Sequence, residues 1–322
     1  MTSTYPAVGR RRGGDRGVVP PGQHLAPVLD WYQASARDLP WRQPDTSPWA
    51  VLVSEMMLQQ TPVARVLPAY RAWLDRWPTP AALAADSPAE AVRQWDRLGY
   101  PRRAVRLHAI AQRLVSEHGG EVPASAEVLV TLPGIGPYTA AAVASFAFGQ
   151  RHAVLDTNVR RVLGRLVNGV ALPPAATSAA ERRLAESLLP DEEAVAARWS
   201  VAVMELGALV CTAARPDCAA CPVAGQCTWR RAGRPAGEAR RTQPGYAGSD
   251  RQCRGRLLAV LRAAAGPVLN GELDAAWPDP DQRARALDAL IADGLATRRA
   301  DGAIGLPGDD TGPGPVLGRA RK

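Results

Sequence analysis

The stretch Leu132-Pro133-Gly134-Ile135-Gly136 joins two segments that both carry helical periodicity. Its two glycines allow the backbone to turn tightly and to approach a ligand closely. A helix rich in small residues is predicted over residues 137–148, and its first turn would offer free N–H groups to an anion. The stretch therefore indicates either a hairpin that grips a phosphate or an ordinary tight turn between two core helices.

Helical periodicity extends on both sides of this hairpin, from residue 24 to about residue 230. Proline and glycine interrupt the pattern at intervals, and no stretch shows sustained period-two alternation. The sequence therefore predicts an all-α domain of many short helices. After an amphipathic start at residues 26–31, the expected helices cover residues 51–60, 68–77, 88–98, 102–117, 137–148, 156–168, 177–189 and 193–210.

The segments outside this domain differ from it in composition. Residues 1–22 are rich in Gly, Arg and Pro and predict a disordered basic tail, residues 231–252 a linker, and residues 308–322 a second disordered tail. Residues 253–307 carry three expected helices, at 256–264, 271–277 and 281–293, followed by a hairpin turn at Asp301-Gly302. This order is typical of a winged-helix-like unit, which either binds DNA or packs against a partner.

The charge balance limits the chemistry. The 322 residues hold 39 basic and 31 acidic groups, a net charge of +8, and 38 of the basic groups are Arg. The single lysine is Lys322, so an internal Schiff-base lysine is excluded. The charge is compatible with a polyanionic partner without proving one. No apolar run approaches the roughly 20 residues of a membrane span, and no secretory signal follows the arginines at 10–12, so we expect a cytoplasmic protein.

Four of the five cysteines fall within seventeen residues, in the pattern C-x₆-C-x₂-C-x₅-C. The four are Cys211, Cys218, Cys221 and Cys227. Zinc sites usually show two C-x₂-C pairs separated by a longer loop, whereas one compact loop of four cysteines fits a [4Fe–4S] cluster better. Zinc and unliganded thiols are the alternatives. Cys253 lies outside the group.

Two carboxylates stand out by their surroundings. Glu55 lies in Val53-Ser54-Glu55-Met56-Met57-Leu58, where apolar neighbours would raise its pKa and keep a proton available. Asp156 follows Val154-Leu155 and would, taken alone, be read as a helix cap. Together they match the two-carboxylate chemistry that breaks a bond to a sugar anomeric carbon, in which one group protonates the leaving group and the other stabilises a cation.

In these features the chain resembles the helix-hairpin-helix, iron–sulfur DNA glycosylases, and more closely the adenine DNA glycosylase (MutY) family. The resemblance covers about residues 23–228. The matching elements are Leu39-Pro40-Trp41-Arg42, Ser54-Glu55-Met56-Met57-Leu58-Gln59-Gln60-Thr61, Gly99-Tyr100, the hairpin from Leu132 to Thr139, Leu155-Asp156-Thr157-Asn158-Val159, Leu206-Gly207-Ala208 and the four cysteines.

The resemblance implies a two-lobed core over residues 23–230. A six-helix lobe at 45–151 would hold the hairpin, and residues 23–44 with 152–230 would form a lobe around the [4Fe–4S] cluster. Double-stranded DNA with an adenine opposite 8-oxoguanine or guanine would lie across the cleft, with the adenine flipped into a pocket.

The resemblance also implies roles for single residues. Glu55 would protonate adenine and help to activate water, and Asp156 would stabilise or capture the sugar cation. Tyr138 and Asn158 would order these two carboxylates. Gln60 and Tyr100 would wedge into the base stack. The hairpin would contact DNA through Leu132, Gly134, Gly136 and Thr139. The adenine pocket would be lined by Arg42, Trp49 and Leu58.

Tyr138 separates two related chemistries. In the similar endonuclease III the hairpin carries a lysine there, which attacks the sugar; a tyrosine cannot, so a monofunctional hydrolase is expected.

Pro101 departs from a family pattern that often has a second aromatic residue, and residues 253–310 are too short for the MutT-like domain of many members. Two alternatives to this function remain. One is an endonuclease-III-like or other mismatch or pyrimidine glycosylase, and the other is a non-catalytic iron–sulfur DNA-binding protein.

Overall fold

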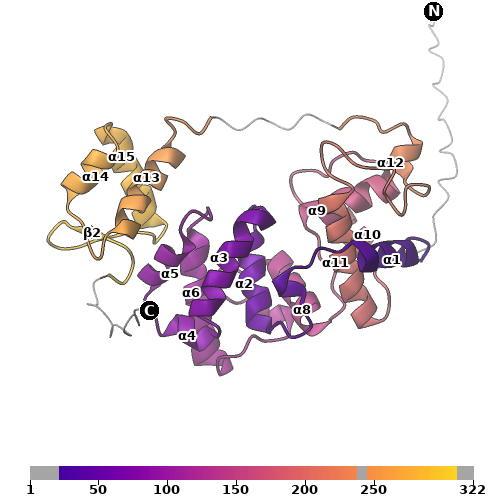
Figure 1. Ribbon diagram of the computed structural model, residues 1–322, viewed down its shortest axis with the longest axis horizontal. Coiled ribbons are helices and arrows are strands. Elements are labelled where there is room, and N and C mark those ends of the chain that lie inside the picture. The colour runs from indigo at the N-terminus through magenta and orange to yellow at the C-terminus, as the bar shows by residue number, and fades with distance from the viewer. Residues whose placement is uncertain (1–21, 238–244, 310–322) are drawn as a thin grey trace, which may run out of the picture.

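The computed structural model describes residues 22–237 and 245–309. Within these ranges the chain is almost entirely helical, with one sheet of two short strands. The helices form three groups that lie side by side along the long axis of the molecule (Figure 1). No helix in the described part of the chain is long and apolar enough to cross a membrane.

The central group contains the helices from α2 to α8. They are α2 (Pro48–Leu58), α3 (Val63–Arg76), α4 (Pro80–Ala84), α5 (Pro88–Trp95), α6 (Arg102–His118), α7 (Ala126–Leu129) and α8 (Pro137–Phe148). The prediction missed the short α4 and α7 and started α3 too late, at Pro68. In the structure α3 continues through Pro68, although this proline has no N–H to donate to the carbonyl of Ala64.

Three tryptophans fill the centre of this lobe. Trp73 and Trp77 meet edge-on with ring centroids 4.6 Å apart, and Trp95 meets Trp73 at 5.5 Å. All three are almost fully buried. Large rings bury much apolar surface each, so a lobe of short helices acquires a substantial core. This core supports α2, the helix that carries Glu55.

The second group brings together segments that are far apart in the sequence. It contains α1 (Leu25–Ser35), a 3₁₀ turn (Pro40–Arg42) that leads into the central lobe, α9 (Thr157–Leu163) with a π-turn (Gly164–Asn168), α10 (Ala179–Ser187), α11 (Glu193–Leu209) and α12 (Thr228–Arg231). Helix α1 packs on α11, so the described chain start lies against the segment that ends in the cysteine loop (Figure 1). The predicted helix over 156–168 is thus a short α-helix continued as a π-turn.

The C-terminal group has three helices and a hairpin, in the order that the sequence predicts. They are α13 (Asp250–Ala263), α14 (Asn270–Ala276), α15 (Pro280–Ala292), β1 (Thr297–Arg298) and β2 (Ile304–Gly305), with Thr297 paired antiparallel to Gly305. Helix α13 begins six residues before the predicted Arg256, because the side chain of Ser249 caps it by accepting from the N–H of Gln252. Residues 1–21, 238–244 and 310–322, which hold most of the two predicted tails and part of the predicted linker, lie outside the described residues.

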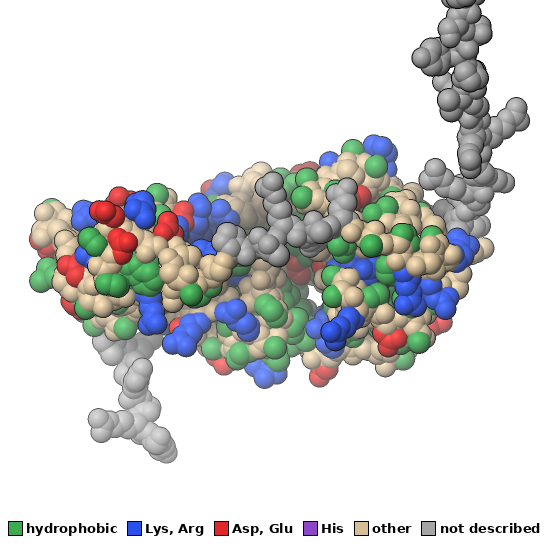
Figure 2. Space-filling model, turned by 90° about the horizontal axis from the view of Figure 1, so that it is seen from above, with side chains coloured by type: hydrophobic (Ala, Val, Ile, Leu, Met, Phe, Trp, Pro, Cys, Tyr) green, Lys and Arg blue, Asp and Glu red, His purple; other side chains and the backbone are tan. Residues whose placement is uncertain are grey.

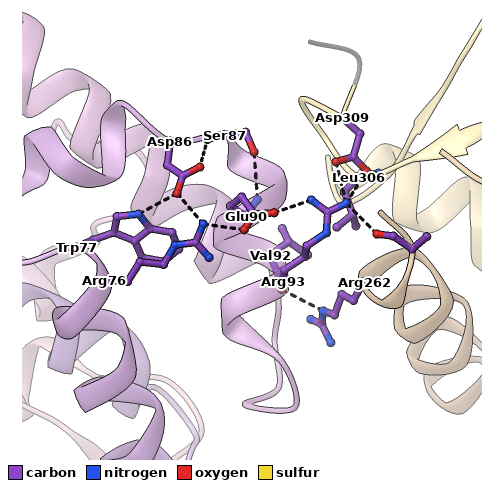
Figure 3. A network of polar contacts seen from close by, with 11 residues as sticks. Arg76, Trp77, Asp86, Ser87, Glu90, Val92, Arg93, Arg262, Leu306 and Asp309 are labelled. Carbon is purple, nitrogen blue, oxygen red and sulfur yellow. Dashed lines mark hydrogen bonds and ion pairs between the residues drawn. The ribbon is translucent and has the colours of Figure 1, made fainter. Parts of the chain in front are cut away.

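The C-terminal group docks on the central lobe rather than standing apart from it. Leu257, Leu261 and Ile304 belong to the same apolar cluster as Leu107 and Val92 of the central lobe. Polar contacts surround this junction: Arg93 of α5 donates to Asp309 at 2.9 Å and to the carbonyl of Ala264 at 3.2 Å (Figure 3). The two groups therefore share one continuous core.

Candidate active site

A cleft of about 1100 Å³ opens between the central lobe and the α1–α11 lobe. Helices α2 and α8 line one side, and the start of α9 together with α11 lines the other. Of the residues predicted from the sequence, Glu55, Tyr138, Asp156, Asn158, Arg42, Leu58 and Gln60 all line this cleft. The fold thus brings together residues that are more than a hundred positions apart.

Glu55 lies on the buried helix α2 and is only 6% exposed. Ser47 caps this helix and Pro48 occupies its first turn, which fixes where the helix begins. Burial raises the pKa of Glu55 to about 7, although a hydrogen bond from Tyr138 Oη to Glu55 Oε2 at 3.1 Å opposes the shift. A substantial fraction of Glu55 is therefore protonated near neutral pH, as a general acid requires.

Asp156 both caps helix α9 and lines the cleft. Its Oδ1 accepts from the backbone N–H of Val159 at 2.6 Å, and its Oδ2 accepts from Asn158 Nδ2 at 2.7 Å. Burial raises its pKa, while these hydrogen bonds counteract the rise. The capping role and the catalytic role considered for this residue are thus compatible, because the cap fixes the carboxylate in one orientation.

Asn158 is held in turn by the rest of its lobe. Arg161 Nη2 donates to Asn158 Oδ1 at 2.8 Å, so the amide group has a defined orientation. Gly207 lies directly behind it: a Cβ at position 207 would stand 2.7 Å from the Cβ of Asn158. The glycine of the Leu206-Gly207-Ala208 motif is therefore required by the close approach of α11 to the start of α9.

A pair of arginines around Glu205 forms the far wall of the cleft. Glu205 is fully buried; burial would raise its pKa, but hydrogen bonds from Arg37 at 2.7 Å and Arg42 at 2.9 Å lower it to about 2. Arg42 Nη1 is buried without a hydrogen-bond partner in the described part of the chain. Sequence reasoning missed Glu205; the only signal was an acidic residue within the apolar run Val203-Met204-Glu205-Leu206.

The hairpin has the geometry that its glycines predict. Gly134 adopts a φ of +77°, and a Cβ there would stand 2.5 Å from Cδ of Arg106, which lies over the turn. Gly136 is the N-cap of α8, so the free N–H groups of that helix follow it. Leu132 and Thr139, for which DNA contacts are predicted, are both buried in the free protein: Leu132 packs in the core, and Thr139 Oγ1 accepts from Gln59 Nε2 at 3.3 Å.

Three other predicted positions divide into two at the rim of the cleft and one in the core. Gln60 and Tyr100 come together at the rim, where Tyr100 Oη donates to Gln60 Oε1 at 2.8 Å and Tyr100 is 57% exposed. Trp49 does not line the cleft: its ring is buried in the core and its Nε1 donates to the carbonyl of Trp77 at 3.1 Å. Its assignment to the adenine pocket was therefore wrong, because its place on α2 turns it toward α3.

The four cysteines of the compact loop line one small pocket, together with Arg165 and Trp229. Arg165 Nη1 lies 3.4 Å from Cys211 Sγ and its guanidinium lies over the Trp229 ring at 4.4 Å. Burial raises the pKa of the Cys221 thiol to about 11. Among the described residues, no group of three or more His, Cys, Asp or Glu side chains is arranged so that it could hold a metal ion. Four thiols beside a buried cation are nevertheless the donor set that suits an anionic thiolate-bound cluster.

The two-lobed helical fold, the hairpin and a cleft with two carboxylates define a base-excision DNA glycosylase. Residues 53–189 match the HhH-GPD superfamily of base excision DNA repair proteins. The chain is 55% identical to the adenine DNA glycosylase of Mycobacterium tuberculosis (strain H37Rv) over 88% of this chain and 93% of the relative. It is 52% identical to that of Mycolicibacterium smegmatis, over 88% and 97%. The chain therefore belongs to the adenine DNA glycosylase family.

The solved structures agree with this fold. A thermostable thymine-DNA glycosylase superposes with a TM-score of 0.58 at 25% identity, over 65% of this chain and 95% of the other. A trapped endonuclease III–DNA covalent intermediate gives 0.55 at 23% identity, over 65% and 94%. The M. tuberculosis match extends over 285 residues and covers 88% of this chain, so it also includes part of the C-terminal group.

Proposed function

We propose that this enzyme hydrolyses the N-glycosidic bond of adenine mispaired with 8-oxoguanine or guanine in double-stranded DNA. The observation that carries the proposal is the arrangement of Glu55, Tyr138 and Asp156 in one cleft. A flipped adenine entering this cleft meets a carboxyl group that burial keeps partly protonated and a second carboxylate fixed by a helix cap. Two carboxyl groups in unlike surroundings divide the acid role from the cation-stabilising role.

The chemical step follows from these positions. Glu55 donates its proton to N7 of adenine, and the base then leaves with the electron pair of the glycosidic bond. Asp156 stabilises the positive charge that develops on the sugar or captures the cation covalently. Water then adds to the anomeric carbon, and its proton returns to Glu55. The products are free adenine and an abasic site.

Tyr138 supports a monofunctional enzyme. Its phenol donates to Glu55 and so orders the acid, whereas an amine at this position would attack the sugar. The one lysine of the chain is residue 322. We therefore expect strand nicking only after alkali or heat. Trapping of a protein–DNA adduct by borohydride at substantial yield would contradict this part of the proposal.

Arg42 is the candidate for recognising the base edge. Glu205 fixes one side of its guanidinium through Nη2, and Nη1 remains as a buried donor without a partner in the described chain. A buried donor that lacks a partner is costly, so a ring nitrogen of the bound base would satisfy it. Leu58 contributes an apolar wall beside it.

The DNA grip and the cofactor complete the proposal. Backbone N–H groups after Gly134 and Gly136 would hold a phosphate, and Gln60 with Tyr100 would enter the base stack near the opposing base. A [4Fe–4S] cluster would be held by Cys211, Cys218, Cys221 and Cys227, and it would order a loop that binds DNA.

We also propose that the protein acts as a monomer in the cytoplasm, at the nucleoid where its substrate is.

A panel of duplexes tests the substrate. Purified enzyme is incubated with adenine opposite 8-oxoguanine, guanine or thymine, and in parallel with duplexes containing oxidised pyrimidines, each with and without alkali. We expect adenine release opposite 8-oxoguanine and guanine. Cleavage at oxidised pyrimidines with adenine left intact would favour an endonuclease-III-like activity. Binding without any base release would favour a non-catalytic iron–sulfur protein.

A further inference from the structure

Arg103, a buried residue that no motif marks, holds two turns at the rim of the cleft together. It lies in the first turn of α6 and is only 3% exposed. Its Nη1 donates to three carbonyls at the end of α2, those of Met56 at 2.8 Å, Met57 at 2.9 Å and Gln59 at 2.7 Å. Its Nη2 donates to the carbonyl of Gly99 and to Thr61 Oγ1, both at 2.9 Å.

The two turns that Arg103 joins are the ones that carry Gln60 and Tyr100. Both residues have positive φ, 55° and 48° respectively, in the left-handed region that residues other than glycine rarely adopt. The carbonyl immediately before each of them, that of Gln59 and that of Gly99, accepts from the same guanidinium. The side chains then meet through the bond from Tyr100 Oη to Gln60 Oε1.

The electrostatics of this contact are unusual. None of the hydrogen bonds that Arg103 makes in the described chain goes to a carboxylate, and burial lowers its pKa to about 10. The rings of Trp95 and Tyr100 lie 5.2 and 5.4 Å from its guanidinium carbon. The carbonyls at the C-terminus of α2 carry partial negative charge and so favour a cation there. Because Glu55 also lies on α2, one side chain links the rim turns to the helix of the acid.

We propose that Arg103 is a positioning residue that presets Gln60 and Tyr100 in the conformation that separates the stacked bases of the mispair. The proposal rests on the wedge role given to these two residues above. Strained backbone at both positions persists only when its surroundings fix it, and Arg103 supplies that constraint from inside the protein. A wedge held ready in the free enzyme avoids the ordering cost that a flexible one would incur on binding DNA.

The first experiment replaces Arg103 by Met and by Lys, with Arg262→Met as the matched control. Arg262 also has its pKa lowered to about 10 by burial and donates to a carbonyl, that of Val92, but it lies in the C-terminal group. The readouts are the fluorescence of 2-aminopurine placed beside the mispair, which rises on unstacking, and single-turnover adenine release. We expect Arg103→Met to lose the fluorescence rise and about tenfold in rate, and Arg262→Met to keep both.

Arg103→Lys keeps the charge but not the planar fork that reaches several carbonyls at once, so its losses should be intermediate. Should Arg103→Met melt below the assay temperature, Arg103→Lys decides the question on the same two readouts. A full fluorescence rise in a folded Arg103 variant would overturn the proposal. A wild-type enzyme that unstacks the neighbouring base but releases no adenine would refute the proposed function and leave the assignment of Arg103 standing.

A double-mutant cycle separates positioning from a general structural role. The Arg103 substitution is repeated in a Tyr100→Ala background, where the wedge is already missing. We expect no further loss of unstacking and almost no further loss of rate there, because residues that act through one another are not additive. An equal loss in both backgrounds would mean that Arg103 only stabilises the fold.

Discussion

At the scale of single residues, Glu55 has a carboxyl group in surroundings that disfavour its charged form. Ordinary solvation would leave it ionised at neutral pH, but burial raises its pKa from 4.5 to about 7. The same burial has a cost to stability. Between pH 4.5 and pH 7 the folded protein binds a proton that the unfolded chain has released, so stability falls as pH rises through this window.

Glu55→Gln should therefore stabilise the protein above pH 7. The amide does not titrate, and the gain over wild type should reach up to about 3 kcal/mol in the free energy of unfolding at pH 8. At pH 4.5 and below the difference should disappear. Denaturant unfolding of both proteins at the two pH values measures it. Equal stability at pH 8 would indicate that burial does not raise the pKa of Glu55.

Tyr138→Phe tests the same carboxyl group through its pH profile. The hydrogen bond from Tyr138 favours the ionised form of Glu55, so its removal should raise the pKa of Glu55 further above 7. The alkaline limb of the single-turnover rate should move to higher pH, because the protonated form persists longer. Tyr70→Phe, at a buried tyrosine beside Trp41, is the matched control and should leave the limb in place. A limb that moved to lower pH would contradict the assignment.

At the scale of elements, the loop from Cys211 to Cys227 is a short irregular segment with little apolar core of its own. Its four thiols converge on one pocket beside Arg165, and the backbone of Arg165 is contacted in return by Cys227 Sγ at 3.5 Å. Such a loop gains order mainly from a bound group. The proposed cluster would therefore order the loop that joins α11 to α12.

Metal analysis tests this element. We expect about four iron atoms and four sulfides per chain, a brown colour, and no stoichiometric zinc. Cys218→Ser should lose iron and weaken duplex binding. Cys253→Ser, at a buried cysteine of the C-terminal group, is the matched control and should keep the full iron content. Stoichiometric zinc in a colourless protein would contradict the cluster.

Elements with a clear local signal were predictable from the sequence. The hairpin, the all-α class and α15 follow from glycine, proline and helical periodicity, all of which act locally. Arg103 and Glu205 were not predictable, because a buried charged residue is recognised only once its partners are in place. Trp49 was assigned to the wrong side of α2 for a related reason: in a helix buried on nearly all sides, periodicity does not indicate which face meets the cleft.

At the scale of the whole molecule, the C-terminal group has two properties that bear on its role. Residues 250–307 hold eight arginines and eight acidic residues, so the net charge of +8 lies elsewhere in the chain. Figure 2 shows acidic side chains gathered on this group, at the left of the view, while basic ones spread over the two lobes. Together with the shared core, this favours packing over the DNA-binding role considered for a winged-helix-like unit.

The junction of this group with α5 should contribute to global stability. Arg93 joins Glu90 of its own helix to Asp309 and the carbonyl of Ala264, and all of these groups are partly buried (Figure 3). Arg93→Ala should therefore lower the stability by about 2 kcal/mol, because Asp309 loses its partner. Arg113→Ala, which removes an exposed i, i+4 pair with Glu117, is the control and should change the stability far less, because solvent screens an exposed pair.

Thermal unfolding of both variants measures the difference. The lobes and the C-terminal group should melt in a single transition, because they share one core. Two separate transitions, or equal effects of the two substitutions, would mean that the C-terminal group is independently folded and only loosely attached.

The most direct test of the whole account is single-turnover release of adenine from an adenine·8-oxoguanine duplex by wild-type enzyme and by Glu55→Gln. The amide keeps the size of the side chain but has no proton to donate, so we expect the rate to fall by at least about 10²-fold while duplex binding is retained. Glu90→Gln, at a carboxylate remote from the cleft, should leave the rate unchanged. Release of adenine by Glu55→Gln at the wild-type rate would contradict the account.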